Sequence, residues 1–324
     1  MSELPVKSDS ASMEQSPKSL LDAAEMFLSS QDVKPSSKKT YRRALRQFVD
    51  WFIKAAIQNP TREDILRYKA TMEAKGHSAY TISNYLVAVR KFFEWAEGMK
   101  FYPNIAKGIK GAKKARGFRK DSPTVAQIRE LLSAIDRSTR QGKRDFAILN
   151  LLIQTGLRTI EIVRANLEDI RNDGGEAVLW IQGKGRDSKD EFVLLTEDSS
   201  GPIREYLQAR GKVNDSDPLF ASLSDRNQNE RLTTRSVSRI VKKQLRAIGL
   251  DSGPLTAHSL RHTAITLCLM GGATIQEGRA LGRHADINTT LVYAQNLDRK
   301  GIHAPERKIE ALLAEVSSWI GARK

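Results

Sequence analysis

Amphipathic helical patterns separated by short connections dominate the chain and limit the folds it can adopt. The clearest covers residues 78–97, where apolar side chains recur every three or four positions: Ile82, Tyr85, Leu86, Val89, Phe92, Phe93 and Ala96. Similar patterns cover residues 19–29, 36–53 and 61–75. Such faces can be buried only against one another. Residues 19–106 are therefore predicted to form a compact helical domain.

The second half of the chain combines helices with one β feature. Helical patterns are predicted over residues 124–135, 143–154, 201–210, 233–248, 258–270, 274–283 and 288–295. Two strand-like runs, residues 177–181 and 192–195, flank Gly183-Lys184-Gly185-Arg186, which predicts a β-hairpin with a cationic tip. We therefore expect a mainly α protein with a small antiparallel β-sheet, in which an α+β domain spans residues 123–303.

Three segments are predicted to lie outside these two domains. Residues 1–18 are polar and are interpreted as a flexible tail. Residues 107–122 carry many lysines and arginines among Gly and Ala, which is typical of a basic linker. Residues 304–324 are predicted to form a last helix with an apolar stripe. That stripe packs either on its own domain or on a neighbouring subunit.

The charge balance indicates a polyanionic partner. The 324 residues have a formal net charge of +15, which favours nucleic acid over an anionic membrane. No apolar run approaches the roughly 18 residues needed to cross a bilayer, and the N-terminus has no apolar signal core. The single Cys268 fits a reducing compartment. We expect a cytoplasmic protein with no membrane partner.

A small set of residues predicts chemistry on a phosphodiester. Tyr293 stands nine residues after His284, and His258 and Arg261 share a helix face further upstream. Arg158 supplies a second guanidinium. A tyrosine can attack a phosphodiester while guanidinium groups bind the non-bridging oxygens. Taken alone, Tyr293 is typical of a core aromatic residue, and only the combination favours a nucleophile.

The order of these motifs resembles the tyrosine recombinase (phage integrase) family, of the two-domain, Xer-like type. The resemblance rests on Thr155-Gly-Leu-Arg158-x-x-Glu161, Gly183-Lys184-Gly185, His258-x-Leu-Arg261-His262, and His284 followed by Tyr293. It extends over roughly residues 19–296, and it includes an N-terminal segment similar to the core-binding domain of that family. It implies an enzyme that cuts and rejoins DNA without a metal ion, ATP or another cofactor.

The resemblance also implies a role for each site residue. Tyr293 attacks the scissile phosphate to form a 3′-phosphotyrosyl link, and Arg158 and Arg261 bind the phosphate oxygens. Lys184 is the general acid, although Lys189 lies close enough to compete. His258 assists removal of the tyrosine proton or hydrogen-bonds the phosphate, and His284 contacts the phosphate. Glu161 steadies the arginine and histidine set. We assign His262 a structural role, because it follows Arg261 directly and points elsewhere on the helix.

The expected partner is double-stranded DNA with inverted-repeat core sites, bound by a homotetramer; the sequence does not identify an accessory protein. Candidate DNA-binding residues occur in both domains and in the linker: Lys38, Lys39, Tyr41, Arg42, Arg43, Lys113, Lys114, Arg116, Arg119, Lys120 and Arg186. The biological role, whether integration and excision or resolution, stays open, as does the target sequence. One departure from the family pattern is Arg283, which stands between Gly282 and His284.

Two alternatives remain at this stage. A type IB topoisomerase shares the chemistry but relaxes DNA as a monomer. A DNA-binding protein without catalysis, acting in architecture or regulation, would account for the charge alone.

Overall fold

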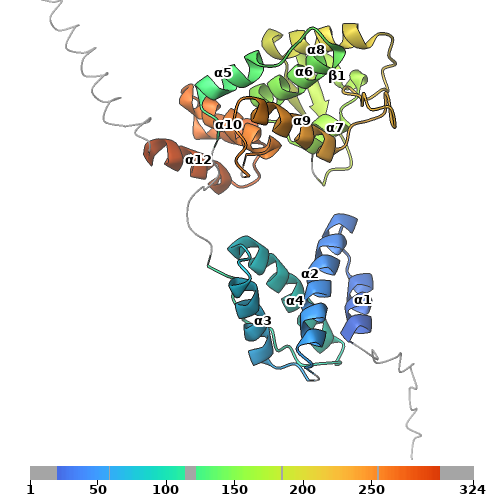
Figure 1. Ribbon diagram of the computed structural model, residues 1–324, viewed down its shortest axis with the longest axis vertical. Coiled ribbons are helices and arrows are strands. Elements are labelled where there is room, and N and C mark those ends of the chain that lie inside the picture. Colours follow the sequence, from blue (N-terminus) through green and yellow to red (C-terminus); the bar gives the residue numbers. More distant parts are fainter. Residues whose placement is uncertain (1–19, 58, 114–121, 184, 254, 300–324) are drawn as a thin grey trace, which may run out of the picture. The chain divides into compact units, whose positions relative to one another are not determined.

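The computed structural model describes residues 20–57, 59–113, 122–183, 185–253 and 255–299 (Figure 1). The chain divides into two compact units, Met1–Arg116 and Gly117–Lys324. The predicted tail and the predicted C-terminal helix lie outside the described residues. Within the described part, no helix is both long enough and apolar enough to cross a membrane.

The first unit is a bundle of the predicted helices, α1 (Leu20–Ser30), α2 (Pro35–Lys54), α3 (Arg62–Ala74) and α4 (Ala79–Gly98). Helix α4 packs against the other three and buries the apolar stripe noted above. Its Phe93 meets Phe48 of α2 edge to face, with ring centroids 6.1 Å apart, and Tyr68 of α3 closes on Phe48 at 5.1 Å. This aromatic centre holds the bundle together.

The first part of the predicted linker belongs to this bundle, which corrects our interpretation of residues 107–122. Ile109 is 2% exposed and lies in the bundle core. The backbone nearby is held by side chains of the helices: Arg62 donates to the Lys107 carbonyl at 2.6 Å and Arg90 to the Ile109 carbonyl at 3.3 Å. The basic composition concealed this packing, because one buried isoleucine is enough to anchor a short segment.

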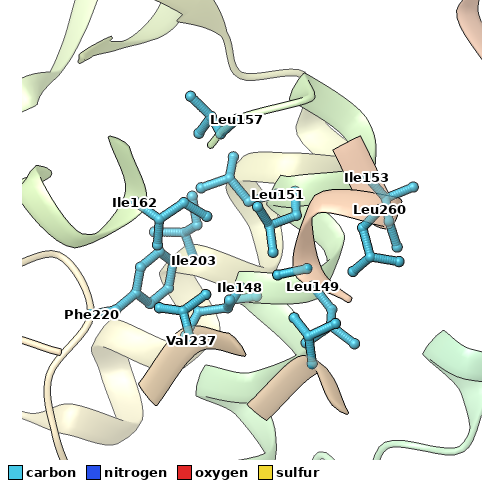
Figure 2. Close-up of a cluster of buried hydrophobic side chains, with 14 of the residues drawn as sticks. Ile148, Leu149, Leu151, Ile153, Leu157, Ile162, Ile203, Phe220, Val237 and Leu260 are labelled. Carbon is cyan, nitrogen blue, oxygen red and sulfur yellow. The ribbon is translucent and has the colours of Figure 1, made fainter. Parts of the chain in front are cut away.

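The second unit is built around the buried helix α6 (Arg140–Thr155). Against it pack α5 (Val125–Ser133), α8 (Glu197–Arg210), α9 (Thr234–Ala247) and α10 (Ala257–Met270). The unit also contains α7 (Thr159–Arg164), α11 (Ile275–Gly282) and α12 (Asn288–Arg299). Figure 2 shows Ile148 and Leu151 of α6 among Ile203, Val237 and Leu260 from three other helices. Helix α6 ends at Gly156, whose φ of 59° is left-handed and therefore suits glycine.

A three-stranded antiparallel sheet of order β1-β2-β3 completes this unit. Its strands are β1 (Ile170–Asp173), β2 (Glu176–Ile181) and β3 (Glu191–Leu194). The predicted hairpin is confirmed, because Leu179 pairs with Val193 and Ile181 with Glu191. Strand β1 and the short helix α7 were not predicted. The expected fold class, mainly α with a small antiparallel sheet, is confirmed.

Truncating a side chain at the centre of α6 tests this account of the core. We expect Leu151→Ala to lower the free energy of opening of α6 by about 2–5 kcal/mol, because it leaves a cavity among buried neighbours. Native-state hydrogen exchange of the α6 amides measures this. Leu194→Ala is the control; its side chain is 48% exposed on β3, and a change within about 0.5 kcal/mol is expected. Equal effects from the two variants would contradict the central role of α6.

Candidate active site

The turn after α6 places the first predicted arginine. Gly156 reverses the chain, and Arg158 then becomes the residue that caps the N-terminus of α7. Its backbone N–H donates to the Glu161 carboxylate at 2.7 Å, and its Nη1 donates to the same carboxylate at 2.8 Å. The Arg158 side chain is 29% exposed. Glu161 thus holds one N–H edge of the Arg158 guanidinium, and the exposed part of the side chain can still reach a ligand.

Glu161 is fully buried and also binds a second guanidinium, that of Arg283 at 2.9 Å. A buried carboxylate is costly unless it is paired and hydrogen-bonded. Here the two arginines hold one oxygen each. The predicted supporting role of Glu161 beside Arg158 therefore has a direct contact, and Arg283 is an unforeseen third member of the cluster.

Arg261 lies on α10 and is only 2% exposed. Its guanidinium donates to the carbonyl of Gly156 at 2.5 Å and also to the carbonyl of Gly282. Burial, with the nearby Arg158 and Arg283, lowers the pKa of Arg261 to about 9, so the group stays charged at neutral pH. The carbonyls of two turns thus orient this cation.

The structure shows what Arg283, the departure from the family pattern, contacts. It is the C-cap of α11 in a left-handed conformation, with φ of 45°, which costs a non-glycine residue roughly 1–2 kcal/mol. Position 282 requires glycine, because a Cβ there would lie 2.8 Å from the His284 ring. The Arg283 guanidinium donates to the Gly156 carbonyl at 3.0 Å as well as to Glu161. Arg283 therefore brings a third guanidinium to the Gly156 turn.

His284 follows Arg283, and its Nδ1 lies 2.9 Å from the Thr290 hydroxyl. Burial lowers the pKa of His284 to about 4, and Arg261, Arg158, Arg283 and His258 act in the same direction. The imidazole is consequently neutral at pH 7.

Tyr293 projects from α12 into the same cluster and is 4% exposed. Its ring stacks near His284, with centroids 6.1 Å apart. Burial raises the pKa of the Tyr293 hydroxyl to about 12, against the opposing effect of Arg261 and Arg158. The hydroxyl is hydrogen-bonded to Nδ1 of His262. The site thus joins residues from α7, α10 and α12 and from the joint between α11 and α12.

The position of His262 differs from the one we expected. His262 does not point away from the site: it is 7% exposed and touches the Tyr293 hydroxyl. Its ring lies 4.4 Å from that of His258, which is exposed at the first turn of α10. Residues four apart share a helix face. The four-residue spacing of His258 and His262 was the sequence signal that places both on one face of α10.

Of the two candidate lysines, the structure describes only Lys189. Lys184 lies outside the described residues, whereas Lys189 is bound to both carboxylate oxygens of the buried Asp169, at 2.7 and 2.6 Å. Arg186 forms an exposed ion pair with Asp190 at 2.7 Å. A cavity of about 710 Å³ lies between the hairpin and α11, lined by Arg186, Asp190, Glu191, Phe192, Gln276, Arg279, Ala280, Arg283, His284 and Ala285. Arg283 and His284 belong both to this lining and to the cluster around Glu161.

The candidate DNA-binding residues of the first unit are not equally available. Lys39 and Arg43 are exposed on α2, and Lys38 is partly buried. Arg42 is engaged by Glu25 at 3.0 Å, and the Tyr41 ring packs 6.3 Å from that of Phe27. Lys113 is exposed. The other linker candidates, Lys114, Arg116, Arg119 and Lys120, lie outside the described residues. In the part of the chain that is described, no group of three or more His, Cys, Asp or Glu residues could hold a metal ion.

Comparison with known proteins identifies the family. The model of the phage integrase family matches residues 123–300, and that of the phage integrase N-terminal SAM-like domain matches residues 25–99. Tyrosine recombinase XerD of Listeria monocytogenes is 32% identical over 269 residues, which cover 79% of this chain and 86% of the relative. Tyrosine recombinase XerC of Herpetosiphon aurantiacus is 31% identical over 288 residues, 85% of this chain and 90% of the relative. The chain therefore belongs to the phage integrase family and is a tyrosine recombinase.

Solved structures show the same fold. The XerH site-specific recombinase bound to a palindromic difH substrate, in a post-cleavage complex, matches with a TM-score of 0.69. The match is 21% identical and covers 89% of this chain and 85% of that one. A lambda integrase fragment bound as a dimer to a COC′ core site matches with a TM-score of 0.65 at 18% identity, covering 85% of this chain and 93% of that one.

The electrostatic coupling within the cluster can be tested at Arg283. We expect Arg283→Gly to raise the pKa of His284 from about 4, because a nearby cation is lost; burial, the larger cause, keeps the value below the ordinary 6.5. Proton NMR titration of the histidine rings measures this, with His284→Gln for assignment. His77, in the other unit, is the control.

The same titration has a consequence for stability. The pKa of His284 is lower in the folded than in the unfolded chain, so the unfolded chain binds more protons between about 6.5 and about 4. The His284 contribution therefore destabilises the fold as the pH drops through that window, and less so in Arg283→Gly. An unchanged His284 pKa in the variant would show that Arg283 does not act on it.

Proposed function

We propose that this tyrosine recombinase breaks and rejoins DNA at specific sites through a covalent 3′-phosphotyrosyl link on Tyr293. The observation that carries the proposal is the burial of the Tyr293 hydroxyl where Arg158 and Arg261 act on it. A phenol with a pKa near 12 attacks at neutral pH only if its proton is removed and its anion stabilised. A cationic cluster supplies that stabilisation.

The two predicted arginines have complementary positions for binding the phosphate. Arg158 is partly exposed; its Nη1 is held by Glu161 and its Nη2 donates to the Arg283 carbonyl at 3.3 Å, so the further N–H groups of the guanidinium suit a non-bridging oxygen. Arg261 is oriented from behind by the Gly156 and Gly282 carbonyls. His284 is neutral and anchored on Thr290, so its other ring nitrogen suits a hydrogen bond to the phosphate. His258, exposed at the start of α10, suits a further contact to the phosphate.

The general acid is assigned to Lys184. The competing Lys189 is held by both oxygens of Asp169, a carboxylate 1% exposed, and leaving Asp169 unpaired would be costly. In the sequence, Lys184 stands between Gly183 and Gly185. A general acid at Lys184 leaves the buried ion pair of Lys189 and Asp169 intact.

The biological unit proposed is a homotetramer on duplex DNA whose core sites are inverted repeats, acting in the cytoplasm without metal, ATP or another cofactor. The excess of lysine and arginine supports DNA as the partner. We assign DNA contacts to Lys39, Arg43, Lys113 and Arg186, and to the linker cations. The segment 304–324 is proposed to dock on its own or a neighbouring subunit. The relatives named above are recombinases, so nothing favours a topoisomerase or a non-catalytic DNA-binding protein.

Removing the phenolic hydroxyl separates binding from chemistry. On a duplex carrying inverted repeats found beside the gene, Tyr293→Phe is expected to bind as the wild type does but to form no covalent protein–DNA adduct. Mobility shift measures binding, and a denaturing gel measures the adduct. Tyr80→Phe, at an exposed tyrosine of the other unit, is the control and should form the adduct normally. An adduct that persists in Tyr293→Phe would show that another residue is the nucleophile.

A sulfur leaving group distinguishes the two lysines. We expect Lys184→Ala to slow cleavage by roughly 10²–10⁴-fold, the usual contribution of a general acid. A substrate with a 5′-bridging phosphorothiolate needs no proton on its leaving group, so it should restore the rate of Lys184→Ala. Lys189→Ala is expected to lower stability instead, because it leaves Asp169 buried and unpaired. If this substrate restored the cleavage rate of Lys189→Ala and not that of Lys184→Ala, the general acid would be Lys189.

A further inference from the structure

We propose that His262 is a further catalytic residue, whose Nδ1 accepts the proton of the Tyr293 hydroxyl as that oxygen attacks phosphorus. The inference rests on the proposed role of Tyr293 as nucleophile. It comes from one contact: the Tyr293 hydroxyl and Nδ1 of His262 are hydrogen-bonded, and the two rings lie 5.2 Å apart. A base must lie within hydrogen-bond reach of the proton it takes, and His262 does.

The surroundings of this pair make such a base necessary. Both side chains are buried, at 7% and 4% exposure, so bulk water is not available to take the proton. Burial also raises the pKa of Tyr293. The cations Arg158 and Arg261 stabilise the tyrosinate once it forms, but a guanidinium accepts no proton.

The other histidines of the site are less suited to this step. His284 stacks beside the Tyr293 ring, but its Nδ1 is engaged by Thr290 and its pKa is low. His258 is exposed, with its ring 4.4 Å from that of His262. That position lets His258 contact the phosphate while His262 serves the tyrosine.

The charged and titratable groups around the pair come from several elements. Arg261 and His258 lie on α10, Arg158 at the start of α7, and Arg283 and His284 at the joint between α11 and α12. The arginines of this set favour negative charge on the Tyr293 oxygen during the reaction.

The step is balanced in atoms and charge. The proton moves from the Tyr293 oxygen to Nδ1 of His262 while the bond from that oxygen to phosphorus forms. The bond from phosphorus to the 5′-oxygen breaks, and the departing oxygen takes a proton from the general acid. In the rejoining step, a 5′-hydroxyl attacks phosphorus and gives its proton to the deprotonated general acid. The bond from phosphorus to the Tyr293 oxygen breaks, and His262 returns its proton to that oxygen.

The test uses the full-length protein and single-turnover formation of the covalent adduct. The substrate is the inverted-repeat duplex with a 5′-bridging phosphorothiolate, so that the general acid does not limit the rate. His262→Ala and His262→Gln are expected to slow adduct formation by roughly 10²–10⁴-fold with DNA binding retained. Their rates should rise with pH as tyrosine ionises unaided. Added imidazole should restore His262→Ala, whose missing side chain leaves room for it.

Matched variants separate this proposal from the proposed function. His77→Gln, at a histidine of the other unit, should match the wild type. If His262→Ala fails to fold, His262→Gln decides alone, because an amide fills the space but is not a base. Adduct formation within about threefold of wild type in His262→Gln, or a loss that does not diminish as the pH rises, overturns the proposal; so does imidazole rescue of His258→Ala but not of a folded His262→Ala. No adduct from the wild type, or an adduct that survives Tyr293→Phe, would instead reject the proposed function itself.

Discussion

The buried carboxylate of Glu161 is the interaction on which the site depends. It holds Arg158 and Arg283 at 2.8 and 2.9 Å, and it also accepts the backbone N–H that begins α7. Concentrating guanidinium groups below the surface is unfavourable without an anion among them. The Gly156 carbonyl reinforces the arrangement by accepting from both Arg261 and Arg283. A left-handed glycine and one glutamate thereby gather three guanidinium groups at the end of α6.

The same cluster accounts for the state of the titrating side chains. Burial keeps His284 neutral and makes Tyr293 a weak acid, while the arginines favour negative charge on Tyr293. These effects leave the tyrosine unreactive in the free protein unless a base and the phosphate are both in place. His262, in contact with the hydroxyl, fits the part of that base. The proposed nucleophile would then react only when its substrate is bound, which fits the proposed covalent storage of a DNA end.

Most of the fold followed from local patterns, and the exceptions have physical causes. Helices such as α4 were predictable because a long apolar stripe must be buried. Strand β1 was missed because its four residues have little apolar character and are stabilised by pairing with β2. The linker was drawn too long, because Ile109 anchors an otherwise polar segment and only the bundle shows where it packs.

For the site, the sequence by itself determined which residue types were present and in what order: the arginines, histidines and tyrosine, and the resemblance that their spacing carries. It also determined the fold class, since apolar periodicity is a property of neighbouring residues. Only the tertiary structure decided the partners. Glu161 and Arg283 are 122 positions apart and His262 and Tyr293 are 31 apart. Local sequence cannot specify such contacts, because the packing of α7, α10, α11 and α12 creates them.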